Sequence, residues 1–136
     1  MEFMTYLKTL NPEDWNVKVT DKWTVKNIVA HMIGWEKGFI DVVQAFMRNE
    51  KQPWFYDMDQ WDKFNEQSID FYKNYSSADL LAEWEKWQRE LRKIIDEFGE
   101  ERLRAHPKLV KWIFDESQDS HYNEHLNQIK QALGKE

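Results

Sequence analysis

The sequence contains no cysteine and has few residues that favour turns. Its 136 residues include four glycines and three prolines. The absence of cysteine excludes disulfide bonds, thiolate metal ligands and a catalytic cysteine. An all-β domain of this length would need more turn residues, so we expect helices.

The chain also lacks a basic surface charge and a long apolar run. Its formal net charge is −6, and its lysines and arginines are spread among acidic residues, so we expect neither nucleic acid nor an anionic membrane as a partner. No apolar stretch approaches the roughly 20 residues of a membrane span. The N-terminus shows no signal-peptide pattern, so a cytoplasmic location is expected.

The composition of the sequence is that of a globular protein. Hydrophobic residues make up 41% and charged residues 32%, which is typical of a folded domain rather than a disordered chain. The length predicts one domain over residues 1–136. Aromatic residues make up 15%, including eight tryptophans. They predict either a bulky core or an aromatic pocket.

Apolar residues recur at three- and four-residue intervals, which is typical of amphipathic helices. Thr24 and Ser76 are suitable N-cap residues before the two longest patterns, and Gly99 and Gly134 follow two pattern ends. The pattern predicts an all-α helical bundle with a long connection over residues 49–76. The expected helices cover residues 2–10, 24–47, 57 or 59 to 75, 76–98 and 119–133.

Three histidines are candidate metal ligands. His121 and His125 stand four positions apart on one expected helix, so both rings project from the same face. Ile129 continues that face, and His31 lies between apolar residues on the second helix. Three buried imidazoles with one open position would form a Lewis-acid site, for which zinc or nickel is suitable. Spacing alone leaves open a surface histidine pair and a hydrogen-bonded core His31.

Two acidic residues and a fourth histidine receive ordinary structural interpretations. Glu124 is expected to face solvent, because it projects away from the face of His121 and His125. Glu36 is expected to face water or the edge of the bundle. His106 precedes a proline and is interpreted as a loop or cap residue.

The residues from Trp23 to Glu36 resemble the first histidine motif of the DinB/YfiT-like superfamily, and 121–129 resemble its closing H-x-x-x-H helix. The middle of the chain, 61–65 and 80–98, is similar to the ClbS/DfsB branch. This resemblance implies a four-helix bundle with a long crossover, containing a short helix, after the second helix. It also implies a divalent metal held by His31, His121 and His125.

For function, the resemblance implies a metal-dependent enzyme that acts on a small molecule, as a hydrolase or a thiol-dependent transferase. A low-molecular-weight thiol is then an expected second substrate. The alternative is a small-molecule-binding or resistance protein with an aromatic pocket and no catalysis.

Three further residues are candidates for the lining of a pocket at the metal: Trp35, Asn65 and Tyr122. Trp35 is one helical turn from His31, but core packing is an equal alternative. Asn65 is a polar residue of the crossover and either orients substrate or faces solvent. The aromatic stretch 53–56 either folds over the site or seals the end of the bundle. The expected first helix is short, which would expose apolar surface and predicts a homodimer.

Overall fold

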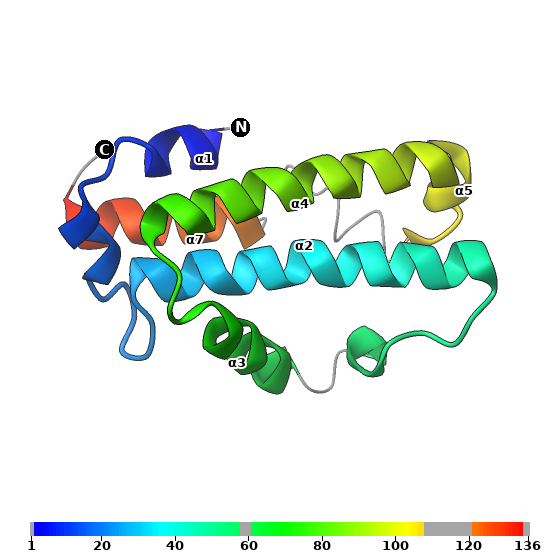
Figure 1. The fold of residues 1–136 in the computed structure, drawn as a ribbon, viewed down its shortest axis with the longest axis horizontal. Coiled ribbons are helices and arrows are strands. Elements are labelled where there is room, and N and C mark those ends of the chain that lie inside the picture. The colour runs from blue at the N-terminus through cyan, green and yellow to red at the C-terminus, as the bar shows by residue number, and fades with distance from the viewer. Residues whose placement is uncertain (1, 58–60, 108–120, 135–136) are drawn as a thin grey trace.

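In the computed structural model the protein is a bundle of helices arranged around one long central helix, α2 (Figure 1). The structure describes residues 2–57, 61–107 and 121–134, without the side chains of residues 2, 57, 61 and 121–123. Within these ranges there is no strand, apart from an isolated bridge between Lys18 and Thr24. No helix in the described ranges is long and apolar enough to cross a membrane. The helices are α1 (Glu2–Leu7), α2 (Val25–Arg48), α3 (Trp61–Tyr72), α4 (Ser77–Phe98), α5 (Glu100–Arg104) and α7 (His121–Leu133), with short 3₁₀ turns at Pro12–Asn16 and Trp54–Asp57.

The ends of the two long helices follow from local sequence. Thr24 Oγ1 accepts a hydrogen bond from the Asn27 amide at 3.2 Å, and Asn27 Oδ1 accepts one from the Thr24 amide at 3.0 Å. This reciprocal cap starts α2. Ser76 Oγ caps α4 by accepting a hydrogen bond from the Asp79 amide at 3.1 Å, and Gly99 ends α4 with a φ of 92°, a conformation that favours glycine. The predicted starts and ends of these helices are confirmed to within one residue.

Figure 1 shows α2 and α4 as long neighbours, with α3 against a different side of α2. Helix α1 packs on α7, and both contribute to the core around the N-terminal half of α2. The crossover from α2 to α4 contains α3, so the expected four-helix bundle with a long crossover is confirmed. Two boundaries were predicted too late, because the first helix ends at Leu7 and α3 at Tyr72. The homodimer inferred from the short first helix stays a prediction.

The core divides into two clusters along α2. The first core cluster joins α1, the N-terminal halves of α2 and α4, and α7. The second core cluster joins the C-terminal halves of α2 and α4 with residues of the crossover and of α5. Buried members of the first include Phe3, Ile28, Met32, Trp84, Leu126 and Ile129, and those of the second include Trp35, Phe39, Phe55, Phe64, Phe98 and Leu103.

Candidate functional site

Two of the three predicted metal ligands meet between α2 and α7. His31 is 1% exposed and His125 is 9% exposed, so both face inward as predicted. Their ring centroids are 4.8 Å apart, and the ring planes are nearly perpendicular at 83°. His121 is the first residue of α7, one turn before His125, but its side chain lies outside the described residues. The fold thus joins distant parts of the chain, which the sequence could not establish.

The hydrogen bonds of the two rings determine which nitrogen carries a lone pair. His31 Nδ1 lies 2.6 Å from the carbonyl oxygen of Ile28. Because a carbonyl can only accept, Nδ1 carries the proton, and the lone pair of the neutral ring is on Nε2. His125 Nδ1 lies 3.0 Å from Gln128 Oε1 and donates to it in the same way. In both rings the lone pair of the neutral form is therefore on Nε2.

The separation of the rings fits shared coordination of one ion. Two imidazoles that bind zinc through Nε2 at about 2.0–2.1 Å, with a tetrahedral angle between them, have centroids about 5 Å apart. The observed distance of 4.8 Å between the centroids of His31 and His125 is close to that value. The donor set and its tautomers therefore fit zinc or nickel, both of which favour imidazole.

Burial favours the neutral form of at least one of these rings. Desolvation lowers the pKa of His125 below its ordinary value of 6.5, against smaller opposing effects of Gln128 and Glu124. A neutral imidazole has the lone pair that a cationic one lacks. Trp23 packs beside His31, with 4.7 Å between ring centroids. His31 is therefore buried beside an aromatic ring.

The described residues supply two candidate ligands rather than a complete set. No group of three or more His, Cys, Asp or Glu side chains that could hold a metal ion occurs among the residues that the structure describes. The third predicted ligand is His121, so the predicted three-histidine site stays a prediction. Tyr122, predicted to line the pocket, likewise has its side chain outside the described part of the chain.

Trp35 and Asn65, two predicted pocket residues, are joined by a hydrogen bond. The indole Nε1 of Trp35 donates to Asn65 Oδ1 at 2.8 Å. Trp35 is buried in the second core cluster, where its ring centroid is 4.2 Å from that of Phe64. Asn65 thus binds a core indole across α2 and α3. A substrate-facing role for either residue stays a prediction.

The structural interpretations of Glu124, Glu36 and His106 have different outcomes. Glu124 is exposed as predicted. Glu36 was predicted to face water or the bundle edge, which is wrong, because it is 2% exposed. The reason is that α2 packs against both α3 and α4, so more of its circumference is buried than its apolar pattern indicates. His106 is a packing residue as well as a loop residue, since its ring stacks on Phe46 with 4.2 Å between centroids.

Sequence reasoning missed the groups that orient the histidines. Gln128 lies three residues after His125, a spacing that places two side chains on the same helix face and could have revealed it. The Ile28 carbonyl, three residues before His31, is a backbone group, and the residue pattern did not indicate its role. Trp23 belongs to the quoted motif, but nothing in the pattern indicated that its ring packs on His31.

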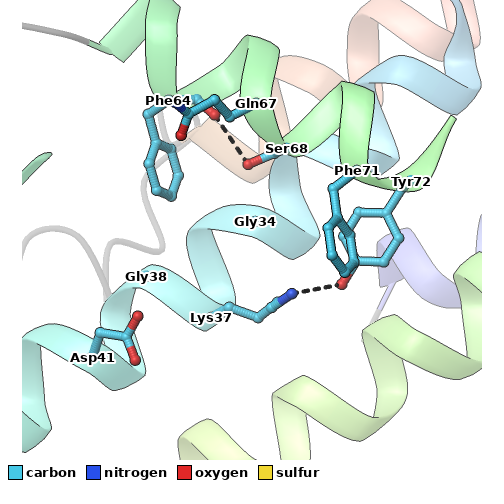
Figure 2. Close-up of a pocket in the computed structure, with 9 residues that line it drawn as sticks. All are labelled: Gly34, Lys37, Gly38, Asp41, Phe64, Gln67, Ser68, Phe71 and Tyr72. Atoms are coloured by element: carbon cyan, nitrogen blue, oxygen red, sulfur yellow. Dashed lines mark hydrogen bonds between the residues drawn. The ribbon is translucent and has the colours of Figure 1, made fainter.

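A separate pocket lies between α2 and α3 (Figure 2). It has a volume of about 200 Å³ and contains none of the predicted site residues. The stretch 53–56, a possible lid in the sequence, instead packs Phe55 into the second core cluster while Trp54 is 48% exposed. This arrangement favours the interpretation as a seal. The pocket is lined by Gly34, Lys37, Gly38, Asp41, Phe64, Gln67, Ser68, Phe71 and Tyr72.

The described residues form a helical bundle with a buried histidine pair contributed by α2 and α7. The sequence profile of the DinB superfamily matches residues 1–117. The chain belongs to the DinB superfamily. The matched residues include His31 and end before α7, so the histidines of α7 rest on the sequence and the structure alone. No curated protein and no solved structure matches the chain.

Proposed function

We propose that His31, His121 and His125 bind one divalent metal ion, zinc or nickel, and that the protein is a metal-dependent enzyme acting on a small molecule. The observation that supports this most directly is the buried pair His31 and His125. Each ring uses Nδ1 as a donor and carries its lone pair on Nε2. The two rings meet edge to face, at 83° between their planes, and a buried neutral imidazole needs partners for both of its nitrogens.

The roles of the chain's own residues follow from these contacts. The Ile28 carbonyl and the Gln128 amide hold the tautomers and the ring orientations, as outer partners do in metal sites. Trp23 and the buried surroundings exclude water from one side of His31. When bound to three nitrogen ligands, the metal supplies Lewis acidity and an open position for substrate.

We propose hydrolysis or thiol transfer as the reaction, with a low-molecular-weight thiol as the second substrate in the transfer. This part rests on the resemblance of residues 61–65 and 80–98 to the ClbS/DfsB branch, to which we assign the chain. The two reactions differ in a simple observation. A hydrolase acts on its substrate in the absence of thiol, whereas a transferase requires one.

Metal analysis of protein purified without a histidine tag tests the proposal. We expect about one zinc or nickel ion per chain, and an affinity at least tenfold lower in His31→Ala, His121→Ala and His125→Ala. His106→Gln is the matched control, because His106 packs on Phe46 at the other core cluster. It should bind metal like the unaltered protein.

Two results would contradict the proposal. Protein that takes up no stoichiometric metal on titration with zinc or nickel would remove the metal site. Full affinity in His121→Ala, with loss in the other two variants, would exclude the three-histidine ligand set. X-ray absorption of the loaded protein should show nitrogen ligands at about 2.0–2.1 Å.

A further inference from the structure

A short hairpin, residues 17–25, forms the loop at the start of α2 (Figure 1). The Val25 amide donates to the Val17 carbonyl at 3.1 Å and closes the hairpin at its base. At the tip, Thr20 Oγ1 accepts a hydrogen bond from the Trp23 amide at 2.9 Å. The hairpin is therefore held in shape by its own hydrogen bonds, including one from a side chain that commonly stabilises turns.

The indole of Trp23 lies against the ring of His31. The two ring centroids are 4.7 Å apart, and the ring planes are tilted by 39°. Trp23 is partly exposed, whereas His31 is 1% exposed. Trp23 thus lies between the surface of the molecule and the imidazole that it covers.

Among the described rings, the second that lies against His31 is that of His125, with 4.8 Å between centroids. Because His31 Nδ1 is bonded to the Ile28 carbonyl, an ion or a reagent must reach Nε2, which carries the lone pair. Trp23 is more exposed than His125, and it belongs to a surface hairpin rather than to a core helix. Displacement of Trp23 therefore opens His31 to solvent with less disruption of the bundle than displacement of His125.

One exposed ion pair ties the tip of the hairpin to the crossover. Lys22 Nζ lies 2.8 Å from Glu66 Oε1 on α3, and the two side chains are 60% and 61% exposed. Among the described residues, no other hydrogen bond or ion pair joins residues 18–23 to a different element. Exposed ion pairs contribute little to stability and are weakened by salt. The packing of Trp23 against the first core cluster is therefore the main restraint on the tip.

We propose that residues 18–23 form a gate over the histidine pair. Trp23 covers His31, and the ion pair between Lys22 and Glu66 is a latch that favours the closed position. Surface loops with few contacts to the core open locally at low cost, and an indole has no lone pair to offer a metal ion. The gate therefore sets the rate at which ions and small molecules reach and leave the ring, rather than the affinity with which they bind. The shielding of His31 is independent of the metal proposal, whereas control of metal exchange rests on it.

Acylation of histidine by diethyl pyrocarbonate, followed by mass spectrometry, tests the cover in metal-free protein. The reagent attacks the lone pair of a neutral imidazole, which in His31 is on Nε2. His31 should react at least about fivefold faster in Trp23→Ala than in the unaltered chain, because the indole no longer blocks the ring. His106, which packs on Phe46 at the other core cluster, is the internal reference. The quantity measured is the acylation ratio, the rate at His31 divided by the rate at His106, and an unchanged ratio in Trp23→Ala would overturn the proposal.

A second variant separates the cover from a general effect on the fold. Trp23→Phe keeps an aromatic ring at this position and should leave the acylation ratio within about twofold of that of the unaltered chain. A substitution that loosens the whole bundle would instead raise the rates at His31 and His106 together. Such an equal rise in Trp23→Ala would overturn the gate.

Charge variants test the latch without changing the core. Lys22→Met removes the ion pair with Glu66 and should raise the acylation ratio about twofold. In the unaltered chain added salt should also raise the ratio, because it screens an exposed ion pair, and in Lys22→Met this response should disappear. Lys8→Met is the matched control, because it removes the exposed ion pair with Glu85 of α4, and it should keep the salt response. A salt response that persists in Lys22→Met, or that is lost in Lys8→Met, would overturn the latch.

Zinc exchange tests the same gate at the proposed metal site. Stopped-flow transfer of zinc from the loaded protein to a saturating fluorescent chelator measures the rate of release. Trp23→Ala should release zinc at least about fivefold faster, with a dissociation constant within about threefold of that of the unaltered protein. An unchanged release rate would overturn the control of metal exchange by the gate. Protein that binds no zinc would contradict the metal site instead, and the acylation ratio in Trp23→Ala would then decide the gate.

Discussion

The two core clusters are built from the same two long helices but differ in what they surround. At the first cluster α1 and α7 join α2 and α4, and the segments that form it carry His31 and His125. At the second cluster the described partners of α2 and α4 are a short 3₁₀ turn, α3 and α5. The candidate metal ligands therefore lie at the end where distant segments meet, and the other end, the scaffold end, is packed with apolar side chains.

The indole groups of two buried tryptophans illustrate the same contrast. In the second cluster Trp35 Nε1 has an acceptor in Asn65 at 2.8 Å. In the first cluster Trp84 is fully buried, and its Nε1 has no hydrogen-bond acceptor among the described residues. The scaffold end thus satisfies its buried indole, while the end with the histidines tolerates a buried donor that costs free energy.

The prediction with the largest expected effect concerns a core substitution that should lower stability without changing metal affinity. Phe98 is 3% exposed in the second cluster, so Phe98→Ala should lower the free energy of unfolding by about 3–5 kcal/mol. Because Phe98 does not touch the histidine end, the folded variant should bind zinc with unchanged affinity. Urea denaturation and calorimetric zinc titration measure the two quantities.

Trp84→Ala is the matched change in the first cluster, with a similar loss of stability of about 3–5 kcal/mol. A tenfold loss of zinc affinity in folded Phe98→Ala would show that the clusters act as one unit. The contrast between a site and a scaffold would then be wrong.

The second prediction concerns the close approach of α3 to α2. A Cβ on Gly34 would overlap Ser68 Oγ, whereas a Cβ on Gly38 would lie 3.1 Å from Phe64 Cζ. Gly34→Ala should therefore destabilise by about 1–3 kcal/mol through overpacking, less the roughly 1 kcal/mol that alanine gains in a helix. Gly38→Ala should cost less, because contacts at that distance need only small shifts. Thermal unfolding of both variants measures the difference, and equal stability of the two would contradict the observed contact between α2 and α3.

Much of this arrangement could be predicted because it is local. The caps at Thr24 and Ser76, the stop at Gly99 and the inward face of His125 each depend on residues within one turn. Glu36 was misplaced because its burial depends on neighbours from other helices. The pocket at Lys37 was missed for the same reason, since Phe71 and Tyr72 reach it only after α3 packs on α2.

The third prediction tests the role of Asn65 in the scaffold. Asn65→Ala removes the acceptor of the Trp35 indole, which is 8% exposed. A lost hydrogen bond of this kind should cost about 1 kcal/mol of stability. Asn127→Ala on the exposed side of α7 is the control and should have little effect. A loss of zinc affinity in Asn65→Ala, rather than of stability, would move Asn65 from the scaffold to the site.

The smallest expected effect is a pH dependence of the stability of the metal-free protein, caused by His125. Burial lowers the pKa of His125 below 6.5 in the folded state. Between that lowered pKa and 6.5, the unfolded chain binds more protons than the folded one, so stability falls as the pH falls through this window. Above 6.5 both states are neutral at this residue, and its contribution no longer changes.

Chemical denaturation of chelator-treated protein at several pH values measures this slope. In His125→Gln the part of the slope that comes from this ring should vanish, while a change in the second cluster such as Asn65→Ala should leave the slope intact. Zinc should steepen the dependence in the unaltered protein, because protons then compete with the ion for the imidazole. A slope that is the same in His125→Gln would mean that the ring titrates alike in both states. The inference that burial favours the neutral form of His125 would then be wrong.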